Sequence, residues 1–294
     1  MKLKLVLAAT MVSLASQSFS YTRIVAFGDS LSDQGNVFAL SGTPAAPYWQ
    51  GRYSNGETWI GDLAGRLGLP LSASNLGGKN FAYGGAELDT TNAFSHNGTP
   101  NIGTQIGLFA SGGGTLSSND LVSVWGGGND FLNGATSPST VAGYVTTHLN
   151  SLYALGGRNF IVPNLPPLGY TPANLGGPGE TLANLACAAF NAALAANIAA
   201  FKTAHPGVVV HELNVHSLFT DVRNNPGMLG LTDVTHAYLA TGGDPDHFLF
   251  WDTIHPTKQV HSYVGSKAAL LVPEPTSLAV LGLGVLALAR RRRA

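Results

Sequence analysis

The chain has 294 residues, of which 45% are hydrophobic and 11% are charged, and this balance excludes an intrinsically disordered chain. Between residues 21 and 270, nine Lys and Arg residues face fifteen Asp and Glu residues, so the body is mildly acidic and lacks the basic stripe of a nucleic-acid-binding protein. The single cysteine, Cys187, excludes an internal disulfide, and its alanine-rich surroundings predict a buried position on a helix.

Residues 1–20 have the pattern of a secretory signal peptide. Lys2 and Lys4 give a basic start, residues 5–14 form a short apolar stretch, and the segment ends in small residues at Ser20. An ordinary first helix is the alternative, but a predicted strand begins almost directly afterwards. We therefore expect this segment to be removed on export.

Apolar runs and helical patterns alternate along the rest of the chain. Short apolar runs predict five strands, at residues 24–27, 80–83, 121–125, 160–163 and 208–213. Apolar residues at helical spacing predict four helices, at residues 57–67, 141–155, 181–204 and 259–271. This alternation indicates βαβ units, so we expect one α/β domain over residues 21–271, with a parallel sheet covered on both faces.

Residues suited to chemistry follow four of the predicted strands. In an open α/β sheet, ligands bind outside the carboxyl ends of the strands. The segments after the first, second, third and fifth strands should therefore meet at one edge. They contain Ser30, Gly85, Asn129 and the pair Asp252 and His255.

Ser30 is the candidate nucleophile. It follows the first predicted strand directly, and Gly28 allows the chain to turn sharply there. We expect a helix to start at this point, because a helix N-terminus offers free N–H groups to a developing negative charge. For a serine considered alone, a role as helix N-cap is the alternative.

Asp252 and His255 can supply the base that a serine hydroxyl needs near neutral pH. They are three residues apart, so a turn would bring the carboxylate to one imidazole nitrogen and leave the other nitrogen for Ser30. Activity should then fall on acidification as His255 is protonated. A surface turn is the alternative for an isolated pair at this spacing, and we expect structural or surface roles for the other histidines.

An ester hydrolase must also stabilise the oxyanion of the tetrahedral intermediate. Three donors are available for this oxyanion hole: the backbone N–H groups of Ser30 and Gly85 and the side-chain amide of Asn129. Taken singly, each glycine cluster is explained equally well as a tight turn after a strand.

The combination of these segments resembles the GDSL, or SGNH, hydrolase family. The serine of the family's first block matches Ser30, and the glycine of its second block matches Gly85, with Gly84 as the alternative. The Gly-x-Asn-Asp of its third block places the family's asparagine at Asn129. The Gly-x-Ser-x-Gly motif of ordinary α/β-hydrolases does not occur in the sequence.

The fifth block of the family, Asp-x-x-His, matches Asp252 and His255, and the resemblance spans residues 24–270. Residues 52–56 and 164–169 recur in the bacterial branch that includes phospholipases, haemolysins and autotransporter esterases. The resemblance implies a three-layer, flavodoxin-like α/β fold with a mostly parallel five-stranded sheet. It also implies a Ser-His-Asp triad that needs no metal or other cofactor.

Residues 272–294 resemble the PEP-CTERM sorting signal of Gram-negative bacteria. A Pro-Glu-Pro motif precedes an apolar stretch at 278–289, and four arginines follow. The stretch has 12 residues, short for a transmembrane helix, although snorkelling arginines would lengthen such an anchor and keep transient or lasting membrane contact. The resemblance implies processing by an exosortase-type enzyme, and a final location outside the cell or on the cell-envelope surface.

Together these features predict a secreted serine esterase or lipase that cleaves carboxylic esters through an acyl-enzyme. The bacterial-branch resemblance favours lipid esters. A carbohydrate acetylesterase acting on exopolysaccharide is one alternative, since the sorting signal usually occurs in cells that make exopolysaccharide. A non-catalytic surface or matrix protein on the same scaffold is the other, although a binding module has no use for all the site residues together.

Overall fold

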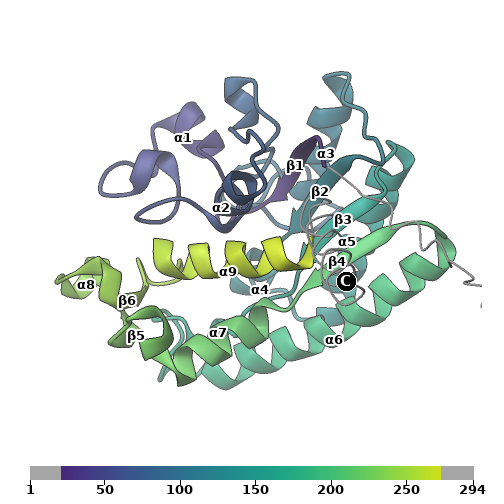
Figure 1. Ribbon diagram of the computed structural model, residues 1–294. Coiled ribbons are helices and arrows are strands. Elements are labelled where there is room, and N and C mark those ends of the chain that lie inside the picture. Colours follow the sequence, from purple (N-terminus) through teal and green to yellow (C-terminus); the bar gives the residue numbers. More distant parts are fainter. Residues whose placement is uncertain (1–20, 273–294) are drawn as a thin grey trace, which may run out of the picture. The chain divides into compact units, whose positions relative to one another are not determined.

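The computed structural model describes residues 21–272 (Figure 1). The predicted signal peptide, residues 1–20, lies outside the described residues, and so does the predicted sorting tail from residue 273 onward. The predictions for these two segments, and for a domain boundary at residue 271, stay predictions.

Four parallel strands form the central sheet, in the order β1-β2-β3-β4. Each corresponds to a predicted strand, with ends that differ by one residue at most. Nearly all residues of the first three strands are buried, as expected for a parallel sheet covered on both faces, whereas β4 at the edge is only partly buried. The four strands are β1 (Arg23–Gly28), β2 (Asp120–Trp125), β3 (Asn159–Pro163) and β4 (Val209–Leu213).

The predicted strand at residues 80–83 lies beside β1 but is not a regular strand. Three backbone hydrogen bonds of 2.7 to 3.0 Å join residues 79–83 to β1, and a single parallel bridge pairs Asn80 with Ala26. On its other side Asn80 bonds to Ser72, so the segment is tied to an irregular loop before it turns away. The prediction of five strands is therefore wrong in its count: the sheet has four, with this irregular segment at the free edge of β1.

A second, two-stranded parallel sheet was not predicted. It pairs β5 (Asp233–Ala237) with β6 (Phe248–Phe250). β5 is largely polar and only partly buried, so it has no apolar run to reveal it in the sequence. β6 is apolar but has only three residues. This small sheet matters because the segment carrying Asp252 and His255 follows β6.

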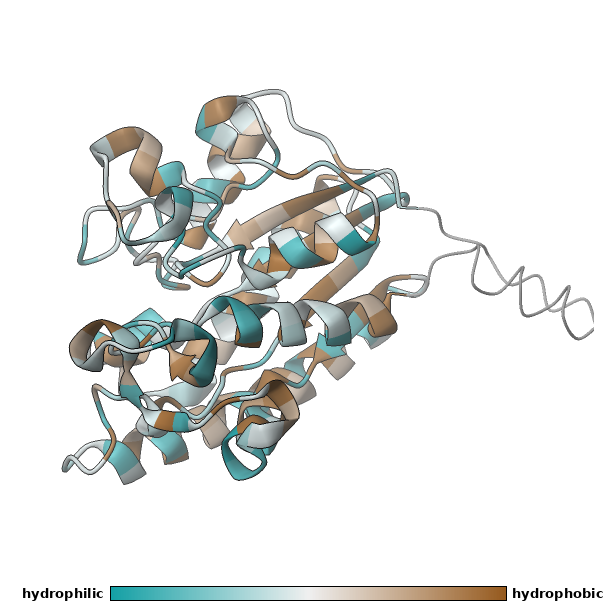
Figure 2. Ribbon diagram, turned by 60° about the vertical axis from the view of Figure 1, so that its left-hand side comes forward, coloured by the Kyte–Doolittle hydropathy of each residue, from teal (hydrophilic) through white to brown (hydrophobic). Residues whose placement is uncertain are grey.

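The sheet lies between two layers of helices (Figures 1 and 2). Alternate residues of its strands contribute to two separate hydrophobic cores. In β1, Val25 and Phe27 belong to one core, while Ile24 and Ala26 belong to the other. Helices α3, α5 and α6 contribute to the first core, and α2, α7 and α9 contribute to the second. The fold is thus a three-layer α/β fold, as predicted.

The helices carry most of the remaining chain. Four of them, α2, α5, α6 and α9, match predicted helices, and the Ser137 side chain caps α5 as its sequence suggests. The longer helices missed by prediction are α3, which contains two glycines, and α7, which is rich in polar and β-branched residues. The bounds are α1 (Asn36–Ser41), α2 (Trp59–Arg66), α3 (Ile102–Ser111), α4 (Gly128–Leu132), α5 (Pro138–Ala154), α6 (Glu180–Ala204), α7 (Val215–Asn224), α8 (Tyr238–Thr241) and α9 (Lys258–Leu271).

Among residues 21–272, α6 is the one helix long and apolar enough to cross a membrane by length and composition. Its side chains at Cys187, Phe190, Leu194 and Phe201 belong to the first core. A helix of a globular domain can pass the same test, and α6 packs against this core through one face. The predicted buried position of Cys187 is confirmed.

Candidate active site

Ser30 lies two residues beyond β1, in a tight turn at the carboxyl edge of the sheet. The N–H groups of Ser32 and Asp33 both donate to the carbonyl of Asp29, at 3.0 Å each. Glycine is needed at position 28, because a Cβ there would come within 2.6 Å of a backbone oxygen of β2. Ser30 remains only 7% exposed.

The turn does not open a helix, which corrects the expectation from sequence. The carboxylate of Asp33 accepts the N–H groups of Gly35 and Asn36 at 2.8 and 2.6 Å, so α1 starts only at Asn36. Gly35 has φ of 102°, which also separates the turn from the helix. Ser30 is therefore not a helix N-cap, and its N–H belongs to a turn rather than to a helix N-terminus.

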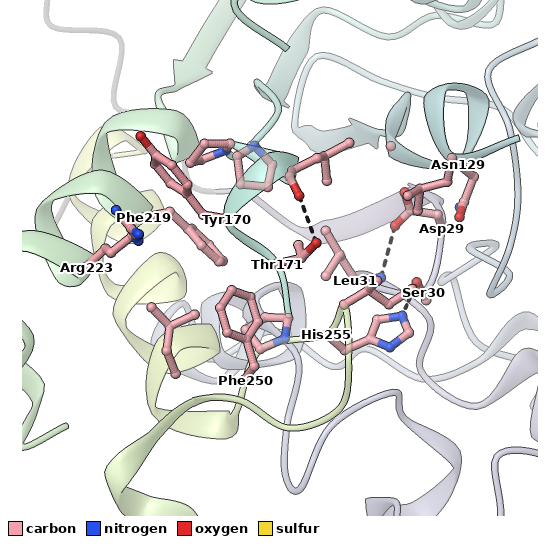
Figure 3. Close-up of a pocket in the computed structure, with 18 residues that line it drawn as sticks. Asp29, Ser30, Leu31, Asn129, Tyr170, Thr171, Phe219, Arg223, Phe250 and His255 are labelled. Carbon is pink, nitrogen blue, oxygen red and sulfur yellow. Dashed lines mark hydrogen bonds between the residues drawn. The ribbon is translucent and has the colours of Figure 1, made fainter. Parts of the chain in front are cut away.

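Asp252 and His255 meet Ser30 across a sequence separation of more than two hundred residues. Nε2 of His255 lies 2.8 Å from Oγ of Ser30 (Figure 3). Nδ1 of the same ring lies 2.7 Å from Oδ2 of Asp252. The other oxygen of Asp252 accepts the backbone N–H groups of Ile254 and His255, at 2.9 and 2.7 Å. These bonds hold the turn that directs the carboxylate at the imidazole.

This turn reaches the site by a different route from the one predicted. The pair was expected in the segment after the last strand of the main sheet, but α7, β5, α8 and β6 lie between β4 and Asp252. The turn is anchored to the small sheet instead. The Thr257 N–H donates to the carbonyl of Leu249 in β6, and the Trp251 N–H donates to the carbonyl of His255, at 2.9 and 2.8 Å.

The electrostatics favour an ionised Asp252. Burial alone would raise the pKa of this carboxyl, but the hydrogen bond and charge of His255, with the two backbone N–H groups, outweigh it and lower the pKa to about 2. Asp252 is therefore a carboxylate throughout the physiological pH range and can stabilise an imidazolium at His255.

The three predicted oxyanion donors surround the same cavity: Ser30 and Gly85 lie on loops, and Asn129 lies in α4. No acceptor within residues 21–272 bonds the N–H of Ser30 or of Gly85. The Gly84 N–H, by contrast, donates to Asp33 at 3.0 Å, so Gly85 rather than Gly84 has the available donor. The side-chain amide of Asn129 donates to the Ala86 carbonyl at 2.9 Å, which connects α4 to the loop that carries Gly85. The second N–H of the same amide takes no part in that bond.

Two tyrosines missed by sequence reasoning complete the surroundings of the imidazole. The phenol of Tyr48 donates to Oδ2 of Asp252 at 2.8 Å. The ring of Tyr53 lies 5.1 Å from the His255 ring, centre to centre. Tyr53 falls in the segment 52–56 that the family resemblance had singled out, whereas no sequence signal links Tyr48 to a residue so far along the chain.

Two buried carboxyls beside the nucleophile have unusual acidities. Burial raises the pKa of Asp29 to about 7, against the opposing effects of the Leu31 N–H and of His255. Burial likewise raises the pKa of Asp33 to about 6, against four backbone N–H donors. Because Asp33 binds both the α1 loop and Gly84, it fixes the loop that carries Gly85 relative to the turn that carries Ser30.

Two cavities open beside Ser30 and His255. The first is narrow and mainly apolar, with a volume of about 60 Å³ (Figure 3). The second is wider and more polar, at about 470 Å³, and contains Tyr53, Gly85 and Asn97 in its wall. The apolar cavity is lined chiefly by Leu31, Leu132, Pro166, Pro167, Leu168, Tyr170, Phe219, Arg223, Leu249, Phe250 and Ile254.

Within the described residues, no group of three His, Cys, Asp or Glu side chains is arranged to hold a metal ion. The side chains and backbone at this site supply a hydroxyl, an imidazole, a carboxylate and amide donors. Such a set suits transfer of an acyl group through the serine oxygen.

Comparison with known proteins agrees with this chemistry. The model of the GDSL-like lipase/acylhydrolase family matches residues 24–268, and the model of the PEP-CTERM protein-sorting motif matches residues 271–293. That motif implies export in Gram-negative bacteria and processing by an exosortase.

Similar sequences and folds span nearly the whole chain. A phosphatidylcholine-sterol acyltransferase of Aeromonas hydrophila is 25% identical, covering 90% of this chain and 94% of its own. An acetylesterase of Thermothelomyces thermophilus is 27% identical, covering 89% and 92%. The solved structure of Est24, a carbohydrate acetylesterase from Sinorhizobium meliloti, has a TM-score of 0.50 at 17% identity, covers 88% of this chain and 99% of its own, and so supports the fold.

Proposed function

The chain belongs to the GDSL-like lipase/acylhydrolase family and is a carboxylic ester hydrolase, and from this premise we propose that it is an exported serine esterase that works through an acyl-enzyme. In this proposal Ser30 is the nucleophile, His255 its base, and Asp252 the carboxylate that orients the base. The observation that carries the proposal is the unbroken hydrogen-bond chain from Asp252 through His255 to Ser30 at the mouth of an apolar cavity.

The first half of the reaction acylates the enzyme. Oγ of Ser30 attacks the ester carbonyl carbon while Nε2 of His255 accepts the hydroxyl proton, and the carbonyl oxygen becomes an oxyanion. The N–H groups of Ser30 and Gly85 and the Asn129 amide stabilise that oxygen. As the intermediate collapses, the C–O bond to the alcohol breaks and His255 returns its proton to the leaving alkoxide.

The second half repeats these steps with water. His255 takes a proton from the water as its oxygen attacks the acyl carbon, and the oxyanion forms again in the same hole. Collapse breaks the bond to Ser30, which recovers the proton from His255, and releases the carboxylic acid. Asp252 stays ionised through both halves and stabilises the imidazolium that forms in each.

The two cavities suggest where the acyl part and the alcohol part of the ester bind. The apolar cavity suits the acyl group, because burial of methylene groups contributes about 0.8 kcal/mol each. The wider, polar cavity suits a hydrophilic alcohol. This arrangement, together with the acetylesterase relative, supports acetylated carbohydrate as a second candidate beside lipid esters. Acetate released from an acetylated polysaccharide, measured against fatty acid released from phospholipid, distinguishes the two.

In this proposal the two terminal segments direct export and processing. The secretory signal at residues 1–20 directs export, and an exosortase acts on the tail, with transient or retained membrane contact through residues 278–289 and a mature body of residues 21–271. Cell fractionation with mass measurement of the exported protein tests this: an intact tail on the mature protein would contradict processing.

The serine assignment is tested with a fluorophosphonate probe and p-nitrophenyl acetate. We expect probe attachment at Ser30, and loss of labelling and turnover in Ser30→Ala. Ser32→Ala is the matched control, because Ser32 shares the turn but its hydroxyl accepts the indole N–H of Trp59. A folded Ser30→Ala protein with unchanged turnover would refute the assignment, and a wild-type protein that neither labels nor turns over would favour the non-catalytic alternative.

A further inference from the structure

Arg223 introduces a positive charge into the wall of the otherwise apolar cavity. It lies in the last turn of α7, and its Cζ atom stacks 3.9 Å from the centre of the Tyr170 ring. Figure 3 places Arg223 and Tyr170 at the side of the cavity away from Ser30 and His255, with Phe219 and Phe250 between the two ends.

The guanidinium has no polar partner among residues 21–272. Its Nε is buried and bonds to no acceptor, and Arg223 takes part in no ion pair or side-chain hydrogen bond. Asp221, two positions earlier on α7, does not pair with it, as expected for residues at that spacing on a helix. Only Nε of this partly exposed side chain is buried without a partner, and five other buried polar atoms of the described residues lack one too. What points to a ligand is therefore the position of this charge in the wall of a mainly apolar cavity.

Other contacts explain the position of Arg223 only in part. A cation near a helix C-terminus is stabilised by the helix dipole, and a guanidinium over a tyrosine gains a cation–π interaction. Neither effect supplies an acceptor for the N–H groups. Arg158 provides a comparison within the same chain: it also stacks on a tyrosine, Tyr153 at 4.1 Å, but its guanidinium donates to two backbone carbonyls.

We propose that the cavity binds an acyl group whose far end carries a carboxylate, so that the enzyme cleaves monoesters of dicarboxylic acids. This inference rests on the proposed function, with the ester carbonyl at Ser30. The apolar walls receive the methylene chain, and Arg223 binds the terminal carboxylate. A guanidinium is suited to this because its planar fork matches the two oxygens of a carboxylate.

The test compares matched substrates. Mono-p-nitrophenyl adipate, suberate and sebacate are measured against p-nitrophenyl hexanoate, octanoate and decanoate, which have the same chain lengths without the charge. We expect the best carboxylate-ended ester to exceed its neutral match in kcat/KM by about tenfold or more, because a charge-assisted pair is worth at least that factor. Arg223→Met, which retains an apolar stem, should abolish or reverse this preference, and Arg223→Lys should retain part of it.

Two controls keep the outcome interpretable. Arg158→Met removes the other arginine–tyrosine stack and should leave the preference unchanged. Ser30→Ala, which cannot turn over, should gain thermal stability with added suberate, and the gain should vanish when Arg223→Met is combined with it.

The outcomes separate the two proposals. An equal preference in wild type and Arg223→Met, with neutral esters cleaved normally, would overturn this inference and leave the proposed function standing. If no ester is cleaved and Ser30 is not labelled, the proposed function fails, and suberate binding then decides the carboxylate site by itself.

Discussion

The phenol of Tyr48 donates to Asp252 at the same oxygen that faces His255, at 2.8 Å. Burial, with the hydrogen bond and charge of Asp252, raises the pKa of Tyr48, so the phenol keeps its proton and remains a donor. One carboxylate oxygen is therefore shared between an imidazole and a phenol from a loop two hundred residues away. Tyr48 is in this sense a positioning residue, which acts on the base through Asp252.

Tyr48→Phe removes this hydrogen bond without removing the ring. We expect kcat for p-nitrophenyl acetate to fall by about tenfold, since hydrogen bonds to charged groups contribute about 1.5 to 3 kcal/mol, and KM to change little. Tyr153→Phe, far from the site, is the control. Unchanged kcat in a folded Tyr48→Phe protein would show that Tyr48 does not act on the base.

Asp252→Asn should reduce kcat by about 10³- to 10⁴-fold. The asparagine amide would donate to Nδ1 of His255, so the proton would sit on Nε2 and the imidazole could no longer accept the proton of Ser30. Steady-state kinetics and a fluorophosphonate labelling rate both report this loss. A folded variant that retains more than a tenth of the activity would exclude Asp252 from the proposed role.

Gly85 and Gly77 allow a matched test of the oxyanion hole, since their φ angles are 81° and 82°. Alanine at either position should cost about 1 to 2 kcal/mol of stability. Only at Gly85 would the new Cβ crowd a neighbour, coming within 2.7 Å of the Asn97 amide, and move the N–H beside Ser30. We expect Gly85→Ala to lose about 10²-fold in kcat and Gly77→Ala to stay near wild type. Equal kcat in both variants would remove Gly85 from the hole.

Asp29 makes stability depend on pH in the direction opposite to a salt-bridged carboxylate. Its pKa is raised to about 7 by burial, so the folded protein binds the proton more tightly than the unfolded chain does. The contribution of Asp29 to the free energy of unfolding is therefore largest below the pKa that the carboxyl has in the unfolded chain, about 3.9. This contribution is lost as pH rises to about 7.

Asp29→Asn should remove this loss while retaining an oxygen for the Leu31 N–H. Urea unfolding at about pH 5 and about pH 8 should show that wild type loses on the order of 2 kcal/mol more than the variant between these values. Asp33 and Asp130, whose pKa values burial raises to about 6, add the same pH dependence to both proteins, so the difference between the two reports Asp29. Parallel slopes would mean that Asp29 titrates normally.

The sequence determined the strand–helix alternation and the four regular strands, and its motifs predicted the residues of the candidate site. These features are local: apolar runs give strands, and short motifs give Ser30 and the Asp252–His255 turn. It was wrong about the fifth strand and about a helix at Ser30, because apolar patterning does not show hydrogen bonds made by particular groups. The backbone N–H of Asn80 donates to the carbonyl of Ser72 in an irregular loop, and the Asp33 carboxylate delays the start of α1.

Only the tertiary structure decided which distant groups share an atom or a cavity. Tyr48 reaches Asp252, and Arg223 faces the cavity at Ser30 without a partner of its own in the described part of the chain. No periodicity or spacing encodes these pairings. They arise because packing of the two cores brings α7, the segment after β6 and residues 43–53 to one edge of the sheet. The hydrogen bonds that form there, and those that do not, determine the role of each side chain.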